Sequence, residues 1–208
     1  MKKKIIICFT GEPRAFLKGL NIREKIFQKF FSNFEIETRY LISFGTKSSS
    51  ENSYRIMKTL KGFDKDKKLR SLRVERTNIR NVFSHIIKQK YDILKEITED
   101  DKELACSDII LTRTDWFFSD DCINLFFKAI KKNKVATPYS YNSFQFYEGI
   151  KYKPVFDQFM VIPGNLLNEV LDSLEKSLLI ASEQKNSFIS KNLRLGGDGK
   201  NRFGMSPE

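Results

Sequence analysis

The stretch Ile5-Ile6-Ile7-Cys8-Phe9 decides the fold class of this chain. It is a short, unbroken apolar run, and such runs are typical of a central strand that is buried on both faces of a sheet. Thr10-Gly11-Glu12-Pro13-Arg14 follows as a turn, and apolar residues at helical spacing then predict a helix over residues 15–33. The chain therefore opens with a strand, a turn and a helix, which is typical of α/β proteins.

The same alternation continues to about residue 181. We expect an α/β fold, a three-layer sandwich with a mainly parallel central sheet, in a single domain over residues 1–208. The ending GDGKNRFGMSPE looks cut before a last helix. The further strands are predicted over residues 38–44, 69–74, 107–112, 135–138 and 156–162, and the further helices over 54–60, 81–98, from 120 onward, and 165–181, with an aromatic loop over 140–154.

Composition excludes several classes of protein. The 208 residues are 40% hydrophobic and 30% charged, which is typical of globular proteins. No apolar run approaches the roughly 18 residues that cross a bilayer, and the apolar stretch after Met1 is too short for a signal peptide. Cys8, Cys106 and Cys122 have no close spacing, so we expect reduced thiols and a cytoplasmic protein.

His85 is the only histidine of the chain. A zinc site would need further clustered ligands, and a histidine-based nucleophilic mechanism would have to use this one imidazole. The pattern around His85 is helical and places it beside the apolar stripe. We therefore interpret His85 as a half-exposed helical residue and expect neither kind of site.

The positive charge is concentrated in the first half of the chain. Lys and Arg number 37 against 26 Asp and Glu, a net charge of +11. Residues 1–104 hold 24 basic and 14 acidic residues, which leaves +10 in that half. Such a half attracts phosphate in nucleotides, nucleic acid or anionic lipid, although solvated surface lysines explain the charge equally well.

Three predicted strand ends carry polar residues, and ligands of parallel sheets bind at the carboxyl ends of strands. After the first strand, Gly11 permits close backbone approach and Arg14 could bind a phosphate. After residues 107–112 come Arg113 and Asp115, two apart, so on an extended chain their side chains point the same way. Asp157 interrupts the last apolar run, where a buried carboxylate needs a partner or a function. The structural alternatives are a solvated Arg14, an Arg113–Asp115 ion pair and an Asp157 that caps locally.

In order and spacing, TGEPRAF (Thr10 to Phe16), RTDW (Arg113 to Trp116) and VFDQFMV (Val155 to Val161) resemble a family of bacterial polysaccharide glycosyltransferases. It is the family that includes the WavE-type lipopolysaccharide synthesis proteins. The resemblance implies a GT-A-like, Rossmann-like fold and a nucleotide-sugar donor. It also implies an acceptor that is a polysaccharide, capsule or lipid-linked intermediate.

The resemblance also implies roles for single residues. Arg14 would approach the donor, Asp115 would take the place of the usual DxD carboxylates, and Asp157 would lie at the acceptor side. The chemistry of the residues adds that Arg14 and the Gly11 amide would hold the donor diphosphate, while Arg113, with an optional divalent cation, Mn or Mg, on Asp115, would stabilise the leaving charge. Asp157 would be the general base if the transfer inverts. The chain has Arg-x-Asp where a strict GT-A enzyme has Asp-x-Asp, so the metal is not a required part of this reading.

Two other functions stay open at this point. One is a nucleotide- or nucleic-acid-binding protein without catalysis, favoured by the basic first half, although no specific nucleic-acid motif is present. The other is a degenerate transferase that acts only as a scaffold.

We also expect weak, salt-reversible association with an anionic membrane surface, peripheral on the inner membrane. It would be centred on residues 58–73, where basic residues crowd. These are Lys58, Lys61, Lys65, Lys67, Lys68, Arg70 and Arg73.

Overall fold

The computed structural model describes most of the chain up to residue 183. The described residues are 3–13, 16–45, 50–64, 69–77, 82–100, 107–114, 119–137, 145–147, 150–152 and 159–183. The expected cut at the C-terminal end lies outside them.

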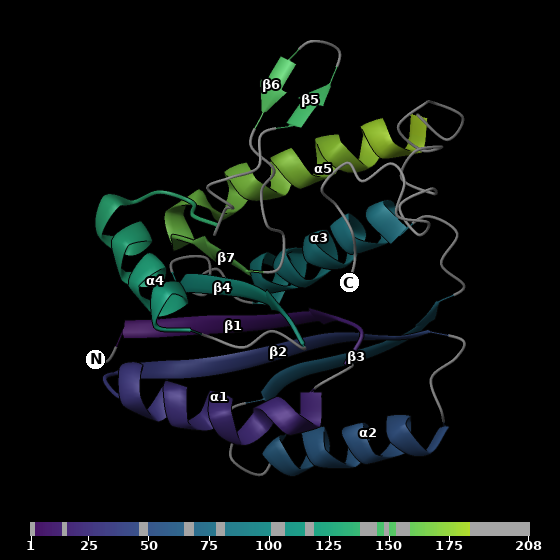
Figure 1. The fold of residues 1–208 in the computed structure, drawn as a ribbon, viewed down its shortest axis with the longest axis vertical. Helices are drawn as coiled ribbons and strands as arrows, with labels where there is room; N and C mark the ends of the chain where they lie inside the picture. Colours follow the sequence, from purple (N-terminus) through teal and green to yellow (C-terminus); the bar gives the residue numbers. More distant parts are fainter. Residues whose placement is uncertain are drawn as a thin grey trace.

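A five-stranded sheet forms the centre of the fold, in the order β3-β2-β1-β4-β7 (Figure 1). The apolar run Ile5–Phe9 lies in the middle strand, as the sequence predicts. The first four strands run parallel, and β7 pairs antiparallel with β4. The expected α/β fold with a mainly parallel sheet is therefore confirmed. The strands are β1 (Lys3–Gly11), β2 (Phe34–Gly45), β3 (Leu69–Thr77), β4 (Asp108–Arg113) and β7 (Phe159–Ile162).

Five helices alternate with these strands, and every predicted helix is present within a few residues of its expected bounds. They are α1 (Phe16–Phe30), α2 (Ser50–Asp64), α3 (Val82–Asp100), α4 (Asp120–Lys132) and α5 (Leu167–Glu183). The start of α4 has the capping that Ser119 and the two following aspartates predict, because the Ser119 hydroxyl accepts a hydrogen bond of 3.3 Å from the Cys122 backbone N–H.

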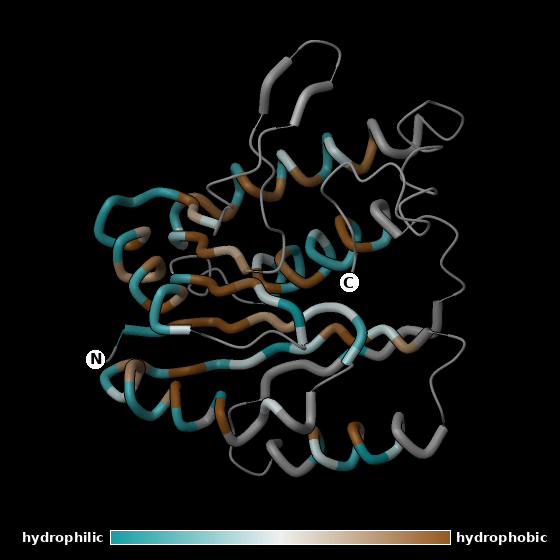
Figure 2. The backbone as a smooth tube through the Cα atoms, in the orientation of Figure 1, coloured by the Kyte–Doolittle hydropathy of each residue, from teal (hydrophilic) through white to brown (hydrophobic). Residues whose placement is uncertain are grey.

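The central strand packs on helices from both sides because its side chains alternate between the two faces of the sheet. Ile5, Ile7 and Phe9 belong to one hydrophobic cluster, with residues of α1, α2 and α4. Ile6 and Cys8 belong to the other, with residues of α3 and α5. All five of these β1 residues are fully buried. Figure 2 shows the result as hydrophobic colour along the central strands.

Two predictions of local structure are wrong. The stretch 140–154, expected as a loop, contains an antiparallel hairpin of β5 (Gln145–Tyr147) and β6 (Ile150–Tyr152). Strands of three residues are too short for alternation to reveal them. The strand expected over residues 135–138 is a single bridge between Ala136 and Val161. Pro138 offers no N–H to continue a ladder.

Candidate functional site

The strand order places a topological switch point between β1 and β4. The chain goes from β1 to β2 on one side, then to β3, and afterwards crosses to β4 on the other side of β1. Connections that leave two neighbouring strands in opposite directions open a crevice at their carboxyl ends, and ligands of open α/β sheets bind there. The predicted site residues Gly11 and Arg113 are the last residues of these two strands.

Gly11 adopts a backbone conformation that glycine favours. Its φ is +97°, in the region that favours glycine. A Cβ built on this residue would meet no atom of the described residues within 4 Å. Among those residues, none blocks the space directly beside the main chain at the end of β1.

Arg113 lies beside the end of β1. It pairs with Thr10 in the parallel register of β1 and β4. Alternation along β4 places Arg113 on the same side of the sheet as Leu111, the side covered by α3 and α5. The residue is partly exposed. A guanidinium at this position adds positive charge to the switch point.

Thr114 joins the two strand ends. Its backbone N–H donates a hydrogen bond of 3.0 Å to the Thr10 backbone oxygen. Its hydroxyl donates a second one of 2.8 Å to the backbone oxygen of Glu12. The residue is fully buried. These bonds fix the turn after β1 against the end of β4, so Gly11 and Arg113 are held in one arrangement.

Thr114 is the site residue that sequence reasoning missed. Its signal is a small polar residue directly after a buried strand, inside the RTDW motif. The charged neighbours Arg113 and Asp115 give the stronger sequence signal, because charge suggests chemistry while a hydroxyl suggests only a turn.

The other predicted site residues cannot be placed. Arg14, Asp115 and Asp157 lie outside the described residues. The strand β7, which follows Asp157 in the sequence, begins at Phe159 opposite Thr112 of β4. Because β7 is antiparallel, it starts at the same edge at which β1 and β4 end. The structure thus brings together Gly11, Arg113 and the start of β7.

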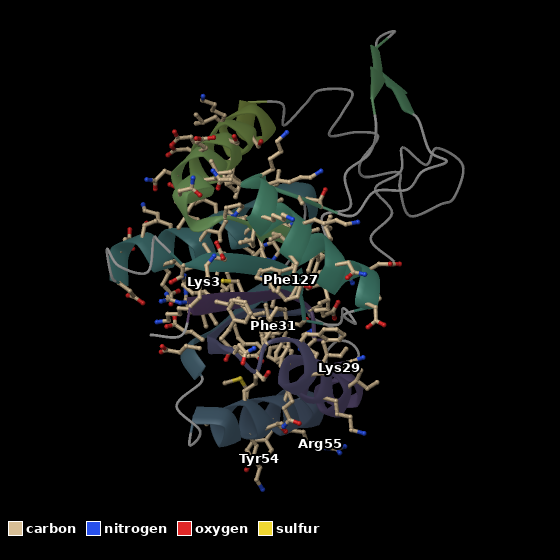
Figure 3. All side chains as sticks on the ribbon, turned by 90° about the vertical axis from the view of Figure 1, so that its left-hand side faces the viewer. Lys3, Lys29, Phe31, Tyr54, Arg55 and Phe127 are labelled. Atoms are coloured by element: carbon tan, nitrogen blue, oxygen red, sulfur yellow. The ribbon has the colours of Figure 1, made fainter. Side chains whose placement is uncertain are left out.

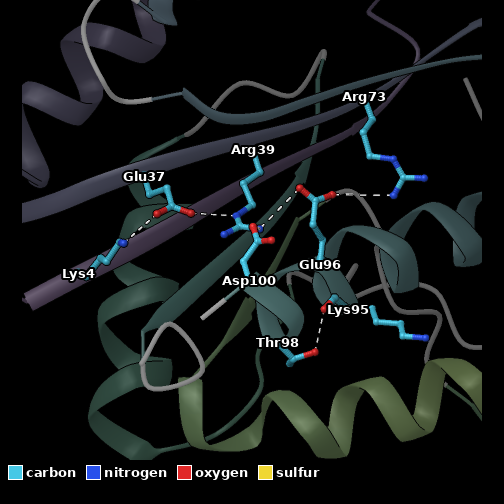
Figure 4. Close-up of polar contacts among 8 residues, drawn as sticks. All are labelled: Lys4, Glu37, Arg39, Arg73, Lys95, Glu96, Thr98 and Asp100. Atoms are coloured by element: carbon cyan, nitrogen blue, oxygen red, sulfur yellow. Dashed lines mark hydrogen bonds and ion pairs between the residues drawn. The ribbon is translucent and has the colours of Figure 1, made fainter. Parts of the chain in front are cut away.

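A buried charge network lies on the α3 side of the sheet, and the sequence did not predict it (Figure 4). Arg39 of β2, with a side chain that is 0% exposed, donates from Nε to Glu37 at 2.8 Å and from Nη1 to Asp100 of α3 at 2.9 Å. Lys4 pairs with the other oxygen of Glu37 at 2.8 Å. Glu96 lies 3.7 Å from the Arg39 Nη1. The network connects β1, β2 and α3.

Cys8 lies on the same face of the sheet as this network, and its thiol is unreactive. Burial raises the pKa of its thiol far above the usual range, and the nearby Arg39 guanidinium only partly offsets this. Cys8 therefore stays a thiol at neutral pH and is a poor nucleophile. Cys8 and Cys122 are both buried as free cysteines, and Cys106 lies outside the described residues. His85 is half-buried in α3, which agrees with its interpretation as an ordinary helical residue.

Metal ligands are not gathered in the part of the chain that the structure describes. No three His, Cys, Asp or Glu side chains come together there in a way that could hold an ion. Asp115, the residue for which a metal was expected, lies outside that part. The described residues thus supply no ligand set for a metal ion.

Comparison with protein-family models and with curated proteins found no match to this chain. The described residues that indicate a function are those at the edge formed by Gly11, Arg113 and Thr114. None of the described helices combines the length and the apolar composition that crossing a membrane requires.

Proposed function

We propose that this protein is a glycosyltransferase that moves a sugar from a nucleotide-diphosphate donor to a surface polysaccharide or lipopolysaccharide intermediate. One observation supports this most strongly. The two motif segments that resemble polysaccharide glycosyltransferases, TGEPR and RTDW, meet at the switch point and are joined there by Thr114. Segments 102 positions apart in the sequence thus form one edge, at the place where open α/β sheets bind nucleotides.

The proposed fold is a three-layer sandwich of the GT-A kind. Support comes from the strand order β3-β2-β1-β4, which corresponds to the 3-2-1-4 order of Rossmann-like sheets, and from helices packed on both faces.

In the proposed reaction the donor diphosphate lies along the backbone at Gly11 and is bound by the guanidinium groups of Arg113 and Arg14. These guanidinium groups neutralise the negative charge that develops on the leaving nucleoside diphosphate. Asp157, two residues before β7, accepts the proton of the acceptor hydroxyl as general base. Asp115, directly after Thr114, takes the place of the DxD carboxylates. The protein would act in the cytoplasm. Its donor substrates would be nucleotide sugars.

The experiment is donor-dependent release of nucleoside diphosphate by the purified protein, measured with a panel of nucleotide sugars. Arg113→Gln should reduce release at least tenfold, because one charged contact to the diphosphate is lost. Arg73→Gln is the matched control: it removes a partly exposed arginine from β3 and should leave the release unchanged.

The second candidate is a nucleotide-binding protein without catalysis. The space beside Gly11, which no described residue blocks, and the charge of Arg113 favour phosphate binding whether or not a reaction follows. Saturable binding of nucleoside diphosphates, with no release from any sugar donor and no effect of Asp157→Asn, would favour this candidate over the transferase.

A further inference from the structure

The outer side of α1 and α2 carries a basic face. Its members are the exposed side chains Lys25 and Lys29 of α1 and Arg55, Lys58 and Lys61 of α2, with the exposed apolar side chains Ile22 and Tyr54 among them. Figure 1 shows both helices on the same side of the sheet. In Figure 3, Tyr54 and Arg55 point away from the sheet, and Lys29 lies on the neighbouring helix.

The spacing of these residues explains why they share one side. Ile22, Lys25 and Lys29 follow one another at steps of three and four, which keeps them on one stripe of α1. The same holds for Tyr54, Lys58 and Lys61 on α2. The opposite stripes face the core, since Phe27 of α1 packs against the hydrophobic cluster beneath and Ile56 and Leu60 of α2 belong to it. Both helices are therefore held against the sheet and turn their basic stripes outward.

The charges described on the exposed side of α1 and α2 have one sign. Of the side chains described on α1 and α2, all five exposed charged ones are Lys or Arg. The side chains of Glu24, Glu51 and Asp64 are not among those described. A concentration of positive charge on one side of a protein attracts an extended anionic surface far more than it attracts a small ion.

The two exposed apolar side chains show which anionic surface fits. Ile22 is 48% exposed and Tyr54 is 68% exposed, between the cations. Helices that lie flat on a bilayer combine Lys and Arg with apolar side chains that enter the interface, and tyrosine suits that depth because its ring is apolar and its hydroxyl polar. A nucleic acid would use the cations but gain nothing from an exposed isoleucine.

We infer that the α1–α2 basic face binds the surface of an anionic membrane. The cations contact the lipid head groups, and Ile22 and Tyr54 enter the interface. This binding is independent of the proposed activity, because it needs neither donor nor acceptor.

The inferred membrane contact differs from the one that the sequence alone predicted. Lys58 and Lys61 of the segment 58–73 do belong to the basic face. Arg73, however, lies on β3 and approaches Glu96 of α3 at 3.8 Å, which places it on the other side of the sheet. The side chains of Lys65, Lys67, Lys68 and Arg70 are outside those described. Lys25 and Lys29, far away in the sequence, take part instead.

The test is co-sedimentation of the full chain with vesicles of phosphatidylcholine alone and of phosphatidylcholine mixed with phosphatidylglycerol. Wild-type protein should bind only the anionic vesicles, and salt at about 0.5 M should release most of it. Each cation near such a surface contributes about fivefold to binding. Lys25→Gln, Lys29→Gln, Lys58→Gln and Lys61→Gln combined should therefore weaken binding at least about 20-fold.

The matched control removes four exposed lysines from and just after α4, on another part of the surface. It combines Lys128→Gln, Lys131→Gln, Lys132→Gln and Lys134→Gln, and lowers the net charge by the same amount. It should weaken binding by no more than about threefold, as expected for long-range attraction alone. Equal losses in the two variants would show that net charge, and not the α1–α2 face, drives binding.

Two further outcomes separate the membrane from other partners. Ile22→Ser with Tyr54→Ser should reduce the binding that persists at high salt, because that part comes from apolar insertion. An oligonucleotide that binds more tightly than the vesicles, and loses affinity in the α1–α2 variant, would assign the face to nucleic acid. That result, or equal binding to neutral and anionic vesicles, would overturn the inference.

Discussion

The hydroxyl of Thr114 donates a hydrogen bond of 2.8 Å to the backbone oxygen of Glu12, 102 positions earlier in the chain. This contact joins the turn after β1 to the end of β4. It makes the two polar strand ends a single structural unit, and it leads to a first prediction about binding.

Thr114→Val removes the hydroxyl and keeps the shape of the side chain. We expect the free energy of unfolding to fall by about 1–2 kcal/mol, because the partly buried Glu12 backbone oxygen loses its donor. Donor affinity should fall at least tenfold, since Gly11 and Arg113 are no longer held together. Urea unfolding and isothermal titration with a nucleoside diphosphate measure the two effects. Thr114→Ser keeps the hydroxyl and should keep the affinity; if Val and Ser variants bind equally well, the contact has no part in binding.

Gly11→Ala tests the backbone at the end of β1. The positive φ of +97° is unfavourable for alanine, although a Cβ would meet no nearby atom of the described residues. The cost is therefore conformational, and we expect a loss of about 1–2 kcal/mol of stability in urea unfolding. Gly11→Asn should cost less, because asparagine adopts positive φ more readily than alanine. A Gly11→Ala protein as stable as wild type would contradict this conformation.

Arg39→Met tests the buried charge network. It removes the cation that Glu37 and Asp100 share, while Glu37 keeps Lys4 and Asp100 is partly exposed, so we expect a loss of about 1.5–3 kcal/mol, as for hydrogen bonds to charged groups. Arg73→Met is the control. Its side chain is 50% exposed and only approaches Glu96, so we expect a loss below about 1 kcal/mol. Thermal unfolding of both variants measures the two losses of stability. Equal losses would show that Arg39 is not the centre of the network.

Cys8 makes stability depend on pH in the alkaline range. Burial raises its pKa in the folded protein, while the thiol of the unfolded chain ionises near its ordinary pKa of roughly 8.5. Above that pH the folded state holds a proton that the unfolded state releases. Stability therefore falls as pH rises, by about 1.4 kcal/mol for each pH unit.

Cys8→Val should abolish the part of the fall in stability with rising pH that comes from the Cys8 thiol. Urea unfolding between about pH 8 and pH 10 measures the slope in both proteins. Identical slopes would show that Cys8 ionises as readily in the folded protein as in the unfolded chain.

The sequence predicted the order of strands and helices because burial of a strand on both faces produces an unbroken apolar run in the sequence. The unbroken apolar run of β1 requires helices on both sides, and the alternation of apolar segments gave every helix. The strand ends at Gly11 and Arg113 could be assigned to one edge for the same reason, since carboxyl ends of parallel strands meet there.

Contacts between residues that are far apart in the chain produce no such pattern in the sequence. The sequence predicted β2 only from residue 38, because Glu35 and Glu37 look solvent-exposed in a linear pattern. In the structure the strand begins at Phe34, paired with Lys3, and Glu37 is stabilised by Lys4 and Arg39. The role of Thr114 likewise depends on Glu12, which only the folded chain brings near.

The central claim is that the edge formed by Gly11, Arg113 and Thr114 serves sugar transfer from a nucleotide donor. The most direct measurement is release of nucleoside diphosphate from a panel of nucleotide sugars, with wild-type protein beside the Arg113→Gln and Thr114→Val variants. The proposal predicts release from at least one donor by the wild type and at least tenfold less by both variants. No release, no hydrolysis and no thermal shift of the wild type with any donor would contradict it.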